Sequence, residues 1–435
     1  MNTFTIQGSK KTITYWILTY TMLMCMFIRY VEHARFWEIG IIICVVYLFA
    51  ISKKYAVVFR SVFFFSILSI SILLYICSSI KTFNIINILT NSEQLFFPII
   101  IATILLSIAL GNPRCLSDFL VSKWWLFNIF WIVNLIVVYL QINGHHIFIK
   151  KEWLDLNDYY PDLCAGLFGF NGTHKLTAYS CFILIYNLAF AKIWRKNKSK
   201  IIIVYTAITE GIMLYLSVGN ENLMIYILLP LCFGLYWLFE LLWSKRTLSK
   251  KTKRILIAIF MIVVVVLFVV QLPIVQQKYL PVISQRINKV LFYRSAAYDL
   301  GGSNERLAIA GYALSKAHGW LIGAGIGAAK WAEEGAFGFQ HYGLNSLGTI
   351  INLGGIWFFL ILVLLYTYIA TKLAYNKHKK HMLLYGLLCG IIIFVFTVCT
   401  IPFTDITLMT WIVCVFVIMG EIHKYYEHSN NYLFR

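Results

Sequence analysis

The chain has 435 residues, of which 60% are hydrophobic and only 13% are charged, and its mean hydropathy is +0.77. A soluble domain of this composition could not cover its surface with polar groups, so the soluble classes are excluded and an all-α polytopic integral membrane protein is predicted. The net charge of +19 does not indicate nucleic acid as a partner, because the basic residues lie in short connections between apolar runs.

Apolar runs long enough to cross about 30 Å of hydrocarbon predict the transmembrane helices. The first run is not followed by a small-residue cleavage site, so we expect it to be a retained helix rather than a removed signal peptide. The chain is expected to form a single transmembrane domain over residues 1–435. We predict about twelve helices, near residues 12–28, 36–52, 61–80, 95–110, 124–142, 176–191, 201–217, 222–243, 255–272, 345–371, 382–399 and 406–422.

Basic residues predict how these helices are oriented. Four connections are rich in lysine and arginine, and a count of twelve helices puts all four on one side of the membrane. By the positive-inside rule that side is cytoplasmic, as are both termini. Two long loops then lie on the outer side, at 143–175 and, between the ninth and tenth helices, at 273–344. Loops of this length usually carry function. The basic connections are residues 53–60, 192–200, 244–254 and 372–381.

The second outer loop contains a well-delimited helix, "SNERLAIAGYALSKAHG". Ser303 suits its N-cap, and Gly319 suits the position just after its end. Arg306 and Glu305 therefore lie in the first turn, where free backbone N–H groups and a guanidinium group together suit a phosphate or diphosphate. From the sequence alone, a structural ion pair between Arg306 and Glu305 or Asp299 is slightly the more favoured interpretation.

Two further features flank that helix. Before it, "VISQRINKVLF" is amphipathic and carries Arg286 and Lys289, which could face anionic headgroups; packing against protein is the alternative. After it, "GWLIGAGIGAAKW" repeats glycine at every second position. No strand is predicted before these glycines, so nucleotide binding is rejected. The glycines instead predict a close approach of backbone to backbone or to a substrate.

The loop ends in "HYGLN", in which His341 and Asn345 lie one helical turn apart on one face. An imidazole can accept a proton near neutral pH, and an amide can orient a hydroxyl or fix the ring. For an isolated histidine, a hydrogen-bonded residue at the membrane interface would be the simpler interpretation. The neighbouring features favour a catalytic one.

The order of features in this loop resembles the O-antigen polymerase and O-antigen ligase superfamily. The matching elements are an arginine opening a helix, "GWLIGAGIG", "HYGLN" and then "NLGGIWFFLIL". In many members the histidine and asparagine are adjacent, whereas three residues separate them here. The stretch "GLFGFNGTHKLTAYSCF" at 166–182 is similar to a segment ahead of a span in the family. The turn "SVGNEN" has Asn220 and Glu221 where many members carry Ser-Arg.

This resemblance implies a GT-C-like fold and an inverting glycosyltransferase of the bacterial inner membrane that needs neither metal nor cofactor. Its donor and acceptor would be undecaprenyl-diphosphate-linked glycans, polymerised into O-antigen or capsular polysaccharide on the outer face. A flippase and a chain-length regulator would be its partners. Transfer of the glycan to lipid A-core, as in the ligases of lipopolysaccharide biosynthesis, is the alternative. Arg306 and His341 are the expected catalytic residues. The expected substrate-binding residues are Arg286, Arg294, Asn345, Glu305, Glu221 and Glu210.

Glu210 also supports an interpretation of another class. A carboxyl group near the middle of a span is costly and usually faces a cavity or a partner, so a flippase or a proton-coupled transporter could use it. The concentration of polar residues in a late outer loop counts against a transporter. Three histidines of the first outer loop, His145, His146 and His174, are expected to be exposed and to bind no metal.

Overall fold

The computed structural model describes helical segments in the first 243 residues and a few short stretches beyond them. The described residues are 2–27, 35–50, 72–73, 75–77, 79–80, 83–156, 160–169, 172–192, 196–220, 222, 224–243, 325–327, 355–357, 360 and 411. No β-strand occurs among them, in agreement with the predicted all-α class. Two of the described helices contain segments long and apolar enough to cross a membrane, Cys115–Ile142 and Ser199–Gly219.

Eight α-helices and two short 3-10 helices make up the part of the chain that is described. The α-helices are α1 (Asn2–Phe27), α2 (Arg35–Ala50), α4 (Ile85–Gly111), α5 (Pro113–Ile142), α6 (Lys151–Leu156), α7 (Thr173–Phe190), α8 (Lys196–Gly219) and α9 (Ile225–Trp243). The 3-10 helices are η2 (Tyr160–Leu163) and η3 (Gly166–Phe168). The long helices coincide with the apolar runs predicted near 12–28, 36–52, 95–110, 124–142, 176–191, 201–217 and 222–243.

Three helices begin well before their predicted starts: α1 at Asn2 rather than near residue 12, α5 at Pro113 rather than near residue 124, and α4 at Ile85 rather than near residue 95. Asn84 caps α4 by accepting a hydrogen bond from the Asn87 backbone N–H at 3.2 Å. At the other end Asn112 terminates α4 and starts α5, where its side chain accepts from the Cys115 N–H at 3.4 Å. Pro113 follows at the first helical position, where its missing N–H has no cost.

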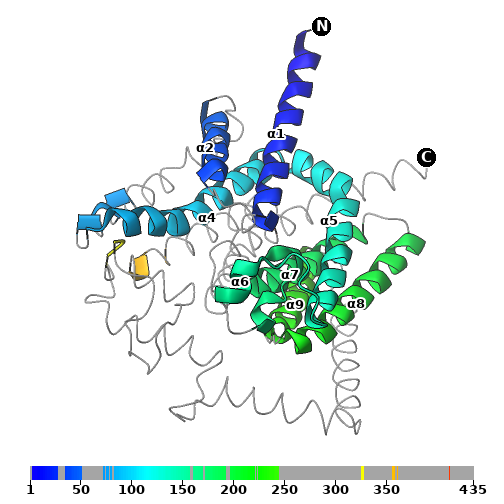
Figure 1. Ribbon diagram of the computed structural model, residues 1–435. Coiled ribbons are helices and arrows are strands. Elements are labelled where there is room, and N and C mark those ends of the chain that lie inside the picture. The colour runs from blue at the N-terminus through cyan, green and yellow to red at the C-terminus, as the bar shows by residue number, and fades with distance from the viewer. Residues whose placement is uncertain are drawn as a thin grey trace, which may run out of the picture.

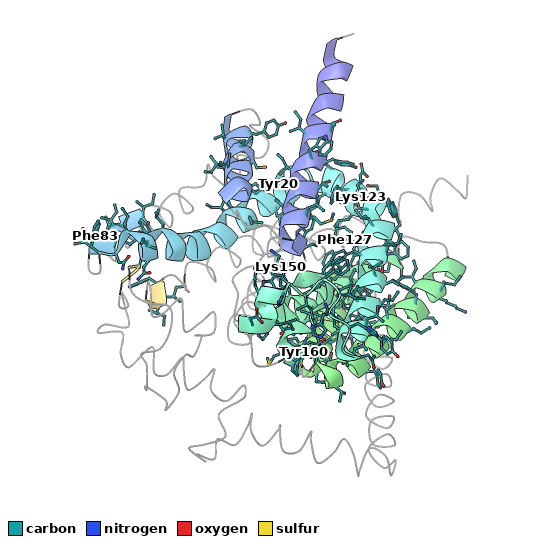
Figure 2. The ribbon with its side chains drawn as sticks, in the orientation of Figure 1. Tyr20, Phe83, Lys123, Phe127, Lys150 and Tyr160 are labelled. Atoms are coloured by element: carbon teal, nitrogen blue, oxygen red, sulfur yellow. The ribbon has the colours of Figure 1, made fainter. Side chains whose placement is uncertain are left out.

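Helix α7 lies at the centre of a four-helix bundle with α5, α8 and α9 (Figure 1). Almost every residue of α7 is buried, as expected of a helix that is apolar or small on all sides. Aromatic rings fill the contact with α5: Phe127 lies 5.2 Å from Phe182 and 5.3 Å from Tyr186 between ring centroids (Figure 2). Helices α1, α2 and α4 lie to one side of this bundle and contact it chiefly through α5 (Figure 1).

Helix α8 packs with one face and leaves the other uncovered by the described residues. Its exposed side chains recur every three or four residues, from Ile201 (67% exposed) through Val204 and Ile208 to Tyr215 (68% exposed). Such a continuous apolar stripe on a helix is unfavourable in water and suits contact with lipid. This agrees with the length and composition of the segment.

Candidate functional site

Most of the residues predicted to form the active site lie outside the described residues. This applies to the two expected catalytic residues and to six others of interest in or near the outer loops: Arg306, His341, Arg286, Arg294, Glu305, Asn345, Asp299 and Glu221. The described part of the chain does include Glu210, the glycine segment of the second outer loop, and the polar residues at one end of the bundle.

The glycine segment Gly325–Gly327 is buried and lies beside the start of α4 (Figure 1). The side-chain amide of Asn87 donates to the Gly327 carbonyl at 3.0 Å. Gly325 has a φ of +112°, a backbone conformation that side chains with a Cβ rarely adopt. The prediction that these glycines allow a close approach of backbone to backbone or to a substrate stays a prediction, because the observed contact joins a side chain to a carbonyl. This contact joins residues 240 positions apart in the chain.

At one end of the bundle, α5 and α8 finish and α7 and α9 begin; we call this the loop end. There a buried stretch of irregular backbone, residues 163–168, enters the bundle. Gln141 accepts from the Gly166 N–H at 2.7 Å, and Asn134 accepts from the Leu167 N–H at 2.6 Å. Buried backbone of this kind needs such partners, because each unpaired group is costly away from water.

Gly166 is essential to this arrangement. Its φ is +66°, and a Cβ at this position would lie 2.2 Å from the Asn134 side-chain oxygen. From the opposite side of the stretch, the Asn220 amide donates to the Cys164 carbonyl at 3.0 Å. The irregular segment is therefore held by amide side chains from both α5 and the turn that follows α8.

The first turn of α7 carries buried polar groups at the same loop end. His174 is 7% exposed and Lys175 is fully buried. The prediction that His174 is an exposed loop residue is therefore wrong: α7 already begins at Thr173, and its first turn packs inside the bundle. His145 and His146 are exposed, as predicted. No sequence pattern singled out Lys175, although a lysine entering an apolar run was a usable signal.

Asn222 ties α7 to the turn between α8 and α9. Its side chain donates to the Thr173 carbonyl at 3.0 Å and accepts from the Thr177 hydroxyl at 2.9 Å. Nearby in the first outer loop, the Tyr160 hydroxyl donates to the Gln141 carbonyl at 2.8 Å (Figure 2). Partial burial raises the pKa of Tyr160, and the neighbouring Cys164 acts in the same direction. The phenol therefore stays neutral and keeps its proton for this hydrogen bond.

Glu210 lies near the middle of α8 and is 5% exposed. The Ser180 hydroxyl of α7 donates to its Oε2. Trp131 of α5 is its second polar neighbour. Nevertheless, Glu210 Oε1 and the Trp131 indole nitrogen each lack a hydrogen-bond partner. We call Glu210, Ser180 and Trp131 the carboxyl cluster.

A second buried polar cluster lies further along α5 and α7, away from the loop end. Asn128 and Asn187 exchange two side-chain hydrogen bonds, at 3.1 and 2.9 Å. The Trp124 indole N–H also donates to Asn187, at 2.9 Å. We call these three residues the amide cluster. Unlike the carboxyl cluster, it contains no carboxyl group, and its amides are paired.

Among the described residues, no three His, Cys, Asp or Glu side chains gather in a group that could hold a metal ion. The buried polar atoms described above come from helices that follow one another in the chain, and none of them forms a recognised nucleotide or metal motif. No family model and no curated protein matches this chain. Any function must therefore be inferred from the residues of this chain.

Proposed function

We propose that this chain is a membrane glycosyltransferase that polymerises undecaprenyl-diphosphate-linked repeat units into O-antigen or capsular polysaccharide. The observation that carries the proposal is the order of Arg306, the Gly323–Gly327 segment, His341 and Asn345 within the longest expected outer loop. In this topology about twelve helices cross the bacterial inner membrane, both termini are cytoplasmic, and the fold is GT-C-like. The two spanning segments found among the described helices support its membrane character.

The contact between Asn87 and Gly327 supports the proposed sidedness. With cytoplasmic termini, α4 begins on the outer side, and so does the loop end of the bundle. The glycine segment of the second outer loop packs against that start of α4, so an outer-loop residue contacts an outer helix end, as the topology requires. The irregular backbone at residues 163–168 and the turn containing Asn220 would lie on this same side.

The proposed reaction is a direct displacement at the anomeric carbon of the donor glycan. The acceptor hydroxyl forms the new glycosidic bond and gives its proton to His341, while the bond to the diphosphate breaks. Negative charge then develops on the leaving lipid diphosphate, and Arg306, with Arg286 and Arg294, stabilises it. Asn345 would orient the acceptor. Because the acceptor attacks opposite the leaving group, the configuration at the anomeric carbon inverts.

A carrier remains the second candidate because of one observation, the burial of Glu210 inside the helix bundle. A flippase or proton-coupled transporter would use such a carboxyl group in its transport cycle. The ligase alternative shares the proposed chemistry but uses lipid A-core as its acceptor. It would leave polymer on the lipid anchor when the gene is deleted, whereas loss of a polymerase would leave single repeats.

The test is a banding gel of surface polysaccharide from deleted cells complemented at matched expression. We expect wild type to restore the ladder, and His341→Ala and Arg306→Ala to leave single repeats on the lipid anchor. The matched controls are His145→Ala and Lys151→Ala, which remove exposed residues of the first outer loop and should restore the ladder. If single repeats never reach the outer face and only Glu210→Ala fails, the protein is a carrier.

A further inference from the structure

The carboxyl cluster occupies a place in the bundle where a charge would be difficult to hold. Glu210 is on α8, in the middle of a segment long and apolar enough to cross a membrane. Its neighbours come from two other helices of the bundle: Trp131 of α5, and Ser180 and Cys181 of α7. The carboxyl group is therefore enclosed on several sides by protein.

The described groups that face Glu210 do not include a cation. Ser180 offers a hydroxyl and Trp131 an indole N–H. The titratable groups near it are Tyr205 on the same helix and Cys181, which are neutral in their protonated forms. An ionised carboxylate enclosed by neutral groups loses its hydration without gaining a counter-charge, which is strongly unfavourable. A neutral carboxyl group avoids that cost.

The hydrogen bonds of the cluster also leave one carboxyl oxygen available. Oε2 accepts from Ser180, whereas Oε1 is buried without a hydrogen bond of ordinary geometry, and the Trp131 indole N–H is the other polar neighbour of the carboxyl group. We propose that Glu210 is a proton-binding site, in which Oε1 takes a proton and the neutral carboxyl group joins α8 to α7 through Ser180. This inference does not rest on the proposed glycosyl transfer, and it holds for an enzyme or a carrier.

Glu210 lies where two helices of the bundle, α7 and α8, pack against each other. Helix α7 is buried on nearly all sides, and α8 packs against it along the contact that contains Ser180 and Glu210. Removal of the proton would put a negative charge into this contact. The packing of α7 against α8 would then depend on whether Glu210 is protonated. The stability of this helix–helix contact would therefore change with pH.

Infrared difference spectroscopy of the full-length protein in lipid nanodiscs tests the proposal directly. At neutral pH the wild-type spectrum should contain the C=O band of a protonated carboxyl group that Glu210→Gln removes. The matched control Glu152→Gln replaces an exposed carboxylate on α6 and should keep that band. If the wild-type minus Glu210→Gln spectrum instead contains the bands of an ionised carboxylate, the proposal is overturned.

A second variant keeps the test valid if Glu210→Gln does not fold. Ser180→Ala retains the carboxyl group but removes its hydrogen-bond donor, so the C=O band should persist and move to higher frequency. An unchanged band in Ser180→Ala would mean that the protonated group observed is not Glu210, and would contradict the proposal. A ladder of polysaccharide is not measured in either experiment, so failure of the proton site and failure of the polymerase proposal are distinguishable.

Discussion

The amide cluster and the carboxyl cluster lie in the same bundle, yet they satisfy their polar groups to different degrees. In the amide cluster Asn128 and Asn187 pair reciprocally, and the Trp124 N–H is also bound. In the carboxyl cluster both Glu210 Oε1 and the Trp131 indole nitrogen are left without partners. A fully paired uncharged network stabilises one packing of the helices, whereas an incompletely paired ionisable one can respond to a ligand as small as a proton.

The largest effect on stability is expected from breaking the amide cluster on one side. Asn187→Leu removes the acceptor that one Asn128 amide N–H and the Trp124 N–H share, while the Asn128 amide keeps its 2.9 Å hydrogen bond to the Trp124 carbonyl. Each buried donor left unpaired is costly, so we expect a loss of about 1–3 kcal/mol in the free energy of unfolding. Thermal unfolding in a fixed detergent measures it, with Ile203→Leu on the exposed face of α8 as the control. A loss no greater than that of the control would mean that the amide cluster does not stabilise the bundle.

Alkaline pH should affect the carboxyl cluster and leave the amide cluster unchanged. As the pH rises, a protonated Glu210 ionises and places a charge inside the bundle, so wild-type stability should fall with rising pH. Glu210→Gln lacks that ionisable group, so its stability should fall less steeply with rising pH. Both proteins retain Tyr205, Cys181 and Cys232, so the difference between their stability curves isolates Glu210. Parallel curves for the two proteins would exclude a proton-linked role.

Comparison of these regions with the sequence shows which parts of the site could be predicted. Apolar runs were sufficient to predict where the long described helices lie, though not where α1, α4 and α5 begin, because each run forms its own backbone hydrogen bonds and needs no distant partner. Glu210 could be singled out because a carboxyl group in a span is costly in any fold. Its partner Ser180 could not, because serine is common in apolar helices and the pairing depends on how α7 faces α8.

The loop end was harder still to predict. The polar stretch at residues 143–175 was expected to be one outer loop, yet residues 163–168 are buried and Thr173 already begins α7. Their burial depends on Asn134, Gln141 and Asn220, which come from different helices and reach the stretch only in the folded bundle. Such long-range contacts cannot be predicted from the neighbouring residues in the sequence. For this reason His174 was wrongly expected to be exposed.

A double substitution sharpens the contrast between the clusters with a smaller expected effect. Asn128→Leu combined with Asn187→Leu removes both members of the amide pair. No asparagine then remains whose amide partner has been removed. The Trp124 N–H then loses its hydrogen bond to Asn187. Since replacing both partners of a buried hydrogen bond by apolar groups can be nearly neutral, we expect the double variant to lose less than about 1 kcal/mol, which is less than Asn187→Leu alone. If the double variant loses as much stability in the same assay as the two single variants together, Asn128 and Asn187 are not energetically coupled.

The smallest effect is expected from Glu210→Gln at neutral pH. If the carboxyl group is already protonated, glutamine replaces one neutral polar group with another of nearly equal size, and its side-chain oxygen can still accept from Ser180. The change in the free energy of unfolding should then stay within about 1 kcal/mol. Glu210→Asp provides the comparison, because it keeps the ionisable group but shortens its reach to Ser180. A large loss in Glu210→Gln with little change in Glu210→Asp would mean that the bundle requires the negative charge. The two clusters would then differ in charge, because one would hold a carboxylate and the other only neutral groups, and not in how completely their polar groups are hydrogen-bonded.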